Sequence, residues 1–218
     1  MNRLLATLRA LRRDQRGVAF VEFALILPLF IGVTVGGVEI ANLMLVNMRV
    51  QRLATQMANI VAQRGASQRP LSEDQVYDVL AAMDVAAAPL DIRRDGRVVL
   101  SAVLGEDTNN DNVADVSRIK WQRFDGGLVS AAPQIGCWST STTATLAKNR
   151  QLSNGEAYFH AQVTLRYRPV FVNVMSYLSV PATITRTSAF RGRGSTFRDV
   201  LAVEGLPPKQ NCASATGL

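Results

Sequence analysis

The chain of 218 residues carries 24 lysines and arginines against 17 aspartates and glutamates, a formal net charge of +7. At about 150 residues per domain, this length predicts one globular domain with an appendage. A hydrophobic content of 48% against 19% charged residues argues against general disorder. Two cysteines and one histidine exclude a disulfide-dense miniprotein, a four-cysteine zinc site and any metal site that needs two histidines.

The positive charge is concentrated at the start of the chain. Residues 1–17 hold five arginines and one aspartate, a net charge of +4, so the remaining residues carry only +3. A pI of about 10.1 would suggest a nucleic-acid partner, but a nucleic-acid footprint is a basic face rather than one short arm. We therefore expect no nucleic-acid binding.

An apolar run follows this basic arm. Val18–Val38 contains 21 residues with a single charge, Glu22, and would form a helix of about 30 Å, the thickness of a bilayer core. The arginines before it predict a cytoplasmic N-terminus and an extracytoplasmic remainder. A secretory signal peptide is the competing interpretation, but the run is long and no small-residue cleavage site follows it.

The helical pattern continues beyond the apolar run. Apolar residues recur at spacings of three and four through Val50, Leu53, Met57 and Val61, and no proline or glycine intervenes before Gly65. The sequence therefore predicts one helix over 18–64, about 70 Å long, whose second half is an amphipathic stem.

Two further features of the apolar run have alternative interpretations. A carboxylate within an apolar span, as at Glu22, is a candidate functional site, although a position at the membrane interface would let it reach water. Gly32 and Gly36 form a G-x-x-x-G step, which favours close packing against another helix but is common in membrane spans.

The stretch Gln15–Pro28, QRGVAFVEFALILP, resembles the start of TadE/TadF-type minor pseudopilins of the tight-adherence (Tad, or Flp) branch of type IV pili. Members of this family have a basic leader ending in glycine, then a helix with glutamate at its fifth position and often a following proline. The matching residues are Gly17, Val18, Glu22 and Pro28. The resemblance covers about the first 50 residues.

The resemblance implies that a prepilin peptidase cuts between Gly17 and Val18, which frees an α-amino group that Glu22 pairs with in its own or a neighbouring subunit. Phe23 and Pro28 would shape the helix. The implied partners are other pilin or pseudopilin subunits and inner-membrane pilus assembly proteins. The implied location is the bacterial inner membrane, with a single span, a cytoplasmic N-terminus, a periplasmic head and possible incorporation into a surface pilus involved in adhesion.

The rest of the chain predicts an α+β head, in which a short helix precedes an antiparallel sheet, as in pilin-like proteins. Ser72 and Gln75 read as a capping box for a helix over 73–84. Residues 126–155 look like a long surface loop, and the tail from Gly205 looks irregular. Apolar and polar residues alternate in several runs, and no long helical crossover separates these runs, so the sequence predicts antiparallel strands. The predicted strands are 97–104, 116–124, 157–167, 170–177 and 182–190. The expected domains are a leader (1–17), the membrane and stem helix (18–64) and the head (65–218).

Cys137 and Cys212 lie in the predicted extracytoplasmic part, where oxidation is permitted. A bridge between them would close a loop of about 75 residues and stabilise the fold by roughly 4 kcal/mol on the entropic model. We predict this bridge, with two free thiols as the alternative.

One string resembles a calcium loop. Asp107, Asn109, Asp111 and Asp115 occupy its first, third, fifth and ninth positions. The sixth position is asparagine rather than glycine, and the twelfth is Arg118 rather than glutamate. An Asn/Asp-rich turn between two strands explains the same residues without an ion, so no cofactor is expected unless calcium binds here.

No Walker loop, G-x-S-x-G or C-x-x-C sequence is present, so we expect no catalytic activity. The interpretation as a tethered periplasmic enzyme therefore has no group of catalytic residues in the sequence to support it. The sequence favours a pseudopilin that acts in Tad pilus assembly through its N-terminal helix. The alternative is an uncleaved, signal-anchored envelope protein whose periplasmic head binds a ligand or surface.

Overall fold

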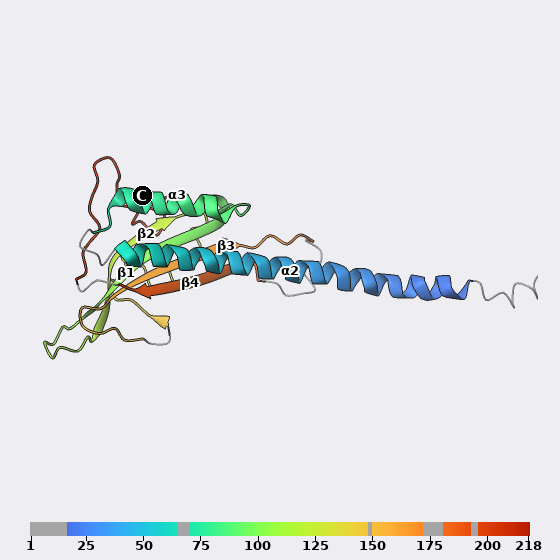
Figure 1. The fold of residues 1–218 in the computed structure, drawn as a ribbon, viewed down its shortest axis with the longest axis horizontal. Coiled ribbons are helices and arrows are strands. Elements are labelled where there is room, and N and C mark those ends of the chain that lie inside the picture. The colour runs from blue at the N-terminus through green and yellow to red at the C-terminus, as the bar shows by residue number, and fades with distance from the viewer. Residues whose placement is uncertain (1–16, 65–69, 148–149, 172–180, 193–195) are drawn as a thin grey trace, which may run out of the picture. The chain divides into compact units, whose positions relative to one another are not determined.

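A computed structural model describes residues 17–64, 70–147, 150–171, 181–192 and 196–218. The predicted leader, apart from Gly17, and most of the predicted strand at 170–177 lie outside these residues. The helices and strands, in chain order, are α2 (Val18–Arg64), α3 (Glu73–Ala87), α4 (Ile92–Asp95), β1 (Gly96–Glu106), β2 (Val116–Asp125), β3 (Ala157–Arg166) and β4 (Thr183–Arg191) (Figure 1).

The chain divides into two compact units. The first comprises residues 1–43 and 169–180, and the second comprises residues 44–168 and 181–218. α2 is one continuous helix through Pro28 and contributes to both units. Its bounds match the predicted helix, because the apolar run passes into the amphipathic pattern without a helix-breaking residue other than Pro28.

The second unit contains a four-stranded sheet in the order β2-β1-β3-β4, and every neighbouring pair is antiparallel. The register shifts between Ala102 and Val103 where β1 meets β2. This arrangement confirms the predicted α+β, pilin-like fold. Four of the five predicted strands form within two residues of their predicted ends. Val170 and Phe171, the described residues of the fifth, form a bend.

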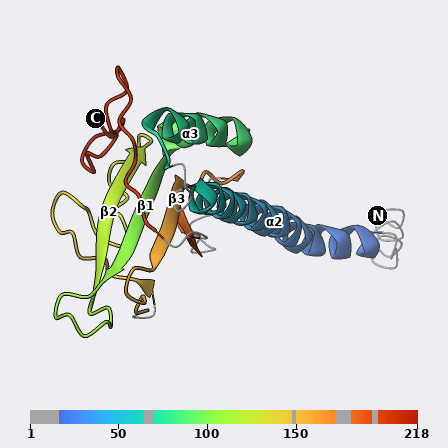
Figure 2. The same cartoon turned by 60° about the vertical axis from the view of Figure 1, so that its left-hand side comes forward.

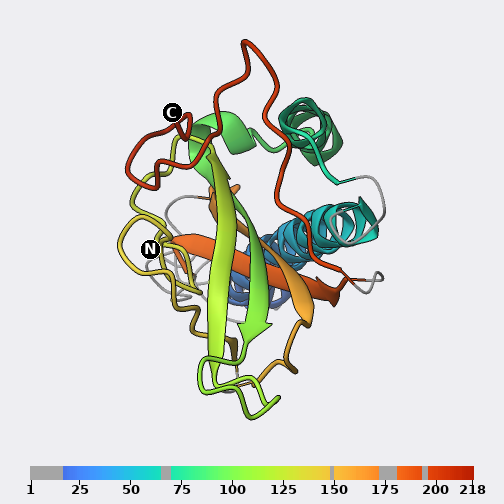
Figure 3. The ribbon, with the colours of Figure 1, turned by 90° about the vertical axis from the view of Figure 1, so that its left-hand side faces the viewer.

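One face of the sheet packs against helices. The part of α2 from Met44 to Arg64 and the whole of α3 cover the same face (Figure 3). On each helix the buried side chains recur at three- and four-residue spacings, as an amphipathic helix on a sheet requires. The buried set is Val50, Leu53, Met57 and Val61 of α2, Val76, Leu80 and Met83 of α3, and Leu100, Phe159, Val163 and Leu165 of the sheet.

A buried ion pair joins α3 to the sheet. The Arg123 guanidinium on β2 donates to both carboxylate oxygens of Glu73 on α3, with Nε 3.0 Å from each. The Glu73 and Arg123 side chains are 3% and 7% exposed, and the guanidinium also lies 5.8 Å from the Trp121 ring centre. This contact fixes the first turn of α3 on the sheet.

The start of α3 differs from the predicted capping box. Ser72 is the N-cap residue, but its side chain accepts no capping hydrogen bond, and the Gln75 side-chain oxygen is buried without a partner. Instead, Ser72 hydrogen-bonds the Asp74 carboxylate, which lowers the pKa of Asp74. The prediction of a capping box was wrong, although the helix begins where it placed the start and extends to Ala87.

The opposite face of the sheet is covered by residues 126–147 and 150–155. This segment was expected to be a surface loop, but Ile135, Leu146 and Leu152 are buried against Val103 and Ile119. Polar side chains of the sheet hold the segment: Gln122 donates from Nε2 to Gly136 O at 2.8 Å. The segment is therefore a loop at the surface, as predicted, but a few buried apolar side chains also make it a second layer of the head.

The C-terminal tail is irregular but held in place along β2 (Figure 2). The structure contains the predicted disulfide between Cys137 and Cys212. The Arg97 guanidinium donates to the carbonyl oxygens of Gly126 at 3.0 Å and Cys212 at 2.9 Å, and burial lowers the pKa of Arg97. Phe124 N also donates to Lys209 O at 2.7 Å, so the tail completes the head.

Candidate functional site

The first candidate site is the start of α2. Gly17 O accepts the first helical hydrogen bond, from Val21 N at 3.1 Å, and the helix begins at Val18. Gly17 and Val18 are both exposed. The predicted cleavage position therefore coincides with the point where helix begins, while cleavage itself stays a prediction.

Glu22 lies on the exposed surface of α2, and its side chain makes no hydrogen bond or ion pair with any residue that the structure describes. It is four residues after Val18, so the two positions share one face of the helix. Its neighbour Phe23 is also exposed. Within this single chain, nothing described neutralises the Glu22 carboxylate.

The apolar half of α2 is unpartnered in the same way. Its most apolar 18-residue window has a mean hydropathy of 2.4 and is not buried at all, whereas a core helix of a soluble protein would be covered. A Cβ atom added at Gly32 or Gly36 would meet no atom within 4 Å. The structure thus gives a helix long and apolar enough to cross a membrane, with an open small-residue step.

A second carboxylate on this helix was missed in the sequence. Glu39 follows the predicted span directly, and its side chain is fully buried. Its Oε2 accepts hydrogen bonds from Val170 N at 3.0 Å and Phe171 N at 3.1 Å, within the same compact unit. The signal was a lone acidic residue directly after Gly36-Gly37-Val38, but the residues that cover it are 131 and 132 positions away.

The Asp/Asn string forms a closed turn between β1 and β2. The Asp107 carboxylate accepts hydrogen bonds from four successive backbone N–H groups, those of residues 109–112, at 2.6–3.3 Å. Asn109 Oδ1 accepts from Asp111 N, and Asp111 Oδ1 accepts from Val113 N. The Asp115 carboxylate binds Thr108 N at 3.0 Å.

These hydrogen bonds favour the turn interpretation over a calcium site. Asn110 and Asn112 have φ angles of 62° and 66°, which asparagine tolerates better than most residues. In the described part of the chain, no three His, Cys, Asp or Glu residues are grouped so that they could hold a metal ion. The carboxylates that would bind calcium are instead engaged with the backbone.

His160 on β3 is buried, and its Nδ1 has no hydrogen-bond partner among the described residues. Burial lowers the pKa of His160 to about 4, because removing the imidazole from water disfavours its charged form. The side chain is therefore neutral at pH 7. It lies in the sheet opposite Ser101 of β1, and no described carboxylate is paired with it.

The comparisons with known proteins agree with the N-terminal features. No curated protein and no solved structure matches the chain. A family model described as TadE-like protein matches residues 17–59, which confirms the resemblance noted in the sequence. The match covers most of α2 and none of the sheet. Over residues 17–59, which include Gly17, Glu22 and Glu39, this chain is therefore similar to the TadE-like protein family.

Proposed function

We propose that this protein is a minor pseudopilin of the Tad (Flp) pilus system that assembles through its N-terminal helix. The observation that supports this most strongly is the exposed, apolar first half of α2. Its apolar half is exposed, it begins at Val18, and Glu22 has no partner among the described residues. An apolar helix with one unpaired carboxylate needs other subunits or lipid around it.

Processing by prepilin peptidase between Gly17 and Val18 would create the partner that Glu22 lacks. Cleavage leaves an α-amino group at Val18, one helical turn from the Glu22 carboxylate on the same helix face. In an apolar environment an isolated carboxylate is costly, and a matched ammonium offsets much of that cost. The pair can form within one chain or between neighbouring subunits.

The other parts of α2 fit the same proposal. The open step at Gly32 and Gly36 would let a second helix approach closely. Pro28 has no backbone N–H, and the loss of this helical hydrogen bond would loosen the helix locally. Phe23 would contribute apolar contact beside Glu22. The partners would be pilin or pseudopilin subunits and inner-membrane assembly proteins.

The proposed topology follows from charge and oxidation state. The arginines before Gly17 favour a cytoplasmic N-terminus, which places the head in the periplasm. The Cys137–Cys212 disulfide is compatible with that oxidising compartment. The alternative, an uncleaved envelope protein with a ligand-binding head, shares this topology but requires neither cleavage nor Glu22.

The test is the exchange Glu22→Ala in a strain that depends on this protein for piliation. We expect normal membrane insertion but at least about tenfold fewer pili, since an unpaired ammonium or lost contact in the apolar layer costs more than about 1.4 kcal/mol. Val21→Ala is the matched control, because it shortens an exposed neighbouring side chain without removing a charge. Normal piliation by Glu22→Ala would refute the role assigned to this carboxylate.

A further inference from the structure

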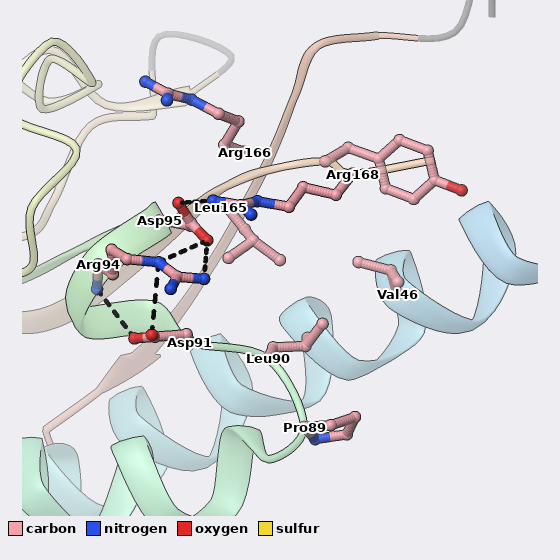
Figure 4. A pocket seen from close by; sticks show the side chains of 10 residues that line it. Val46, Pro89, Leu90, Asp91, Arg94, Asp95, Leu165, Arg166 and Arg168 are labelled. Atoms are coloured by element: carbon pink, nitrogen blue, oxygen red, sulfur yellow. Dashed lines mark hydrogen bonds and ion pairs between the residues drawn. The ribbon is translucent and has the colours of Figure 1, made fainter. Parts of the chain in front are cut away.

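A pocket of about 210 Å³ lies in the second unit, with Val46 of α2 in its lining (Figure 4). Three segments meet there: Val46 of α2, the turn from Pro89 to Asp91 with the adjoining α4, and the end of β3 with the residues after it. Three arginines and two aspartates line the pocket, a net charge of +1. The lining charged residues are Asp91, Arg94, Asp95, Arg166 and Arg168.

Asp95 fixes two of these arginines. Arg168 Nη2 lies 2.7 Å from Asp95 Oδ1, and Arg94 Nη2 lies 3.1 Å from Asp95 Oδ2. The hydrogen bond from Arg168, followed by that from Arg94, lowers the pKa of Asp95, so the anchor is ionised at neutral pH.

The two arginines keep donors for a further ligand. The Asp95 side chain is only 10% exposed, whereas those of Arg94 and Arg168 are 64% and 63% exposed. A guanidinium has five N–H donors, and neither arginine spends all of them on aspartates. The Arg166 side chain turns away from Asp95 and has no hydrogen bond or ion pair to a described residue (Figure 4).

Exposed apolar residues lie on or next to the segments that line the pocket. The segment that leads into the pocket, residues 85–90, comprises the end of α3 and the turn after it and reads VAAAPL, and Val85 is 79% exposed. An ion pair of 2.8 Å between Asp84 and Arg93 holds this turn beside α4. On α2, Met44, Leu45 and Met48 are also exposed. Apolar side chains interspersed with arginines are typical of the membrane–water interface.

The position of Val46 along α2 agrees with such an interface. Val46 lies 28 residues after Val18 in one continuous helix, a distance of about 42 Å. A bilayer with its headgroups is about 40–45 Å thick. If α2 spans the membrane from Val18, the level of Val46 is the headgroup layer of the opposite leaflet.

We infer that this pocket binds the phosphate of an anionic phospholipid in the periplasmic leaflet, while residues 85–90, at the end of α3 and in the turn after it, enter the interface beside it. Arg94 and Arg168 would bind the phosphate oxygens with the donors that Asp95 leaves open, and Arg166 would add positive charge. The inference rests on the proposed membrane orientation of α2, but not on leader cleavage or pilus assembly.

The experiment uses the full chain in nanodiscs of phosphatidylcholine alone or mixed with phosphatidylglycerol, with amide hydrogen exchange measured over residues 85–95 and 165–168. Phosphatidylglycerol should slow exchange there, and Arg94→Gln with Arg168→Gln should reverse the slowing by about fivefold per arginine removed. Arg118→Gln is the matched control, because its partner is Glu106 at the other end of β1.

A second variant does not disturb the Asp95 ion pairs. Val85→Asp changes an exposed residue and should also reverse the slowing, because it places a carboxylate in the interface. Equal exchange in both lipids would overturn the inference. So would equal protection by free inorganic phosphate in phosphatidylcholine nanodiscs, which would assign the pocket to a soluble anion.

Exchange over residues 18–43 separates this inference from the proposed function. Protection there reports insertion of α2; rapid exchange would overturn the membrane orientation and the lipid site together. Protected α2 without a phosphatidylglycerol effect would overturn only the lipid site. Loss of piliation or of cleavage in cells would leave the lipid result unchanged.

Discussion

The two carboxylates of α2 have opposite environments. Glu22 is exposed and has no described partner, whereas Glu39, 17 residues later, is fully buried and binds two backbone N–H groups. Glu39 lies about 32 Å along the helix from Val18, close to the outer boundary of a bilayer core. There, the backbone N–H groups of residues 170 and 171 compensate its carboxylate and are themselves satisfied.

Replacing Glu39 should therefore release Val170 and Phe171. Hydrogen bonds to a charged acceptor contribute about 1.5–3 kcal/mol each, so Glu39→Ala should speed exchange of these two amides by about tenfold or more. Glu39→Gln retains one oxygen acceptor and should have a smaller effect. Glu22→Ala is the control and should leave both amides unchanged; equal exchange in all three variants would contradict the role of Glu39.

His160 predicts a pH dependence of head stability. Its folded pKa of about 4 lies below its ordinary value of 6.5, so between these values the unfolded chain binds the extra proton. Stability from this group is complete above pH 6.5 and decreases as the pH falls towards 4, by at most about 3 kcal/mol. Denaturant unfolding followed by tryptophan fluorescence should show a weaker decrease for His160→Gln, and parallel curves would contradict the assignment.

At the scale of elements, one buried ion pair fixes the first turn of α3 on the sheet. Glu73→Ala leaves Arg123 buried without its carboxylate, and we expect a loss of about 3–5 kcal/mol in unfolding free energy, measured with urea. The double change Glu73→Leu with Arg123→Met should be less destabilising than Glu73→Leu or Arg123→Met alone, because no buried charge remains. A loss equal to the sum of the two single changes would show that the pair itself carries no coupling.

The elements were predictable where the pattern is local. The apolar and amphipathic periodicity of 18–64 contains no helix-breaking residue other than Pro28, and alternation along 157–167 marks β3 to within one residue. The layer formed by 126–155 was not predictable, since its buried residues are scattered among glycine, serine and threonine. The four-residue helix α4 is too short to give a periodic signal.

The contacts of Glu39 and Asp95 could not be predicted, because each joins residues that are far apart in the sequence. Glu39 meets residues more than 130 positions away, and Asp95 meets Arg168 across 73. Neither Glu39 nor Asp95 stands in a motif, so only the fold brings the partners together. Gly17, Val18 and Glu22, by contrast, lie within six residues, and a local motif was sufficient to single them out.

At the scale of the whole molecule, the family match and the sheet lie in separate parts of the chain. The match ends at residue 59, so it bears on the helix and on nothing in the head's sheet. The head is held by its own disulfide, by the Arg97 contacts to the tail and by the buried Glu73–Arg123 pair. A pseudopilin role therefore depends on whether α2 is processed and released for assembly.

The most direct measurement is the N-terminus of the full-length protein recovered from membranes, by intact mass, in cells with and without the cognate prepilin peptidase. We predict a chain that begins at Val18 when the peptidase is present and retains the arginine-rich leader when it is absent. A chain that begins at residue 1 or 2 in both strains would contradict the pseudopilin account and identify α2 as a permanent anchor.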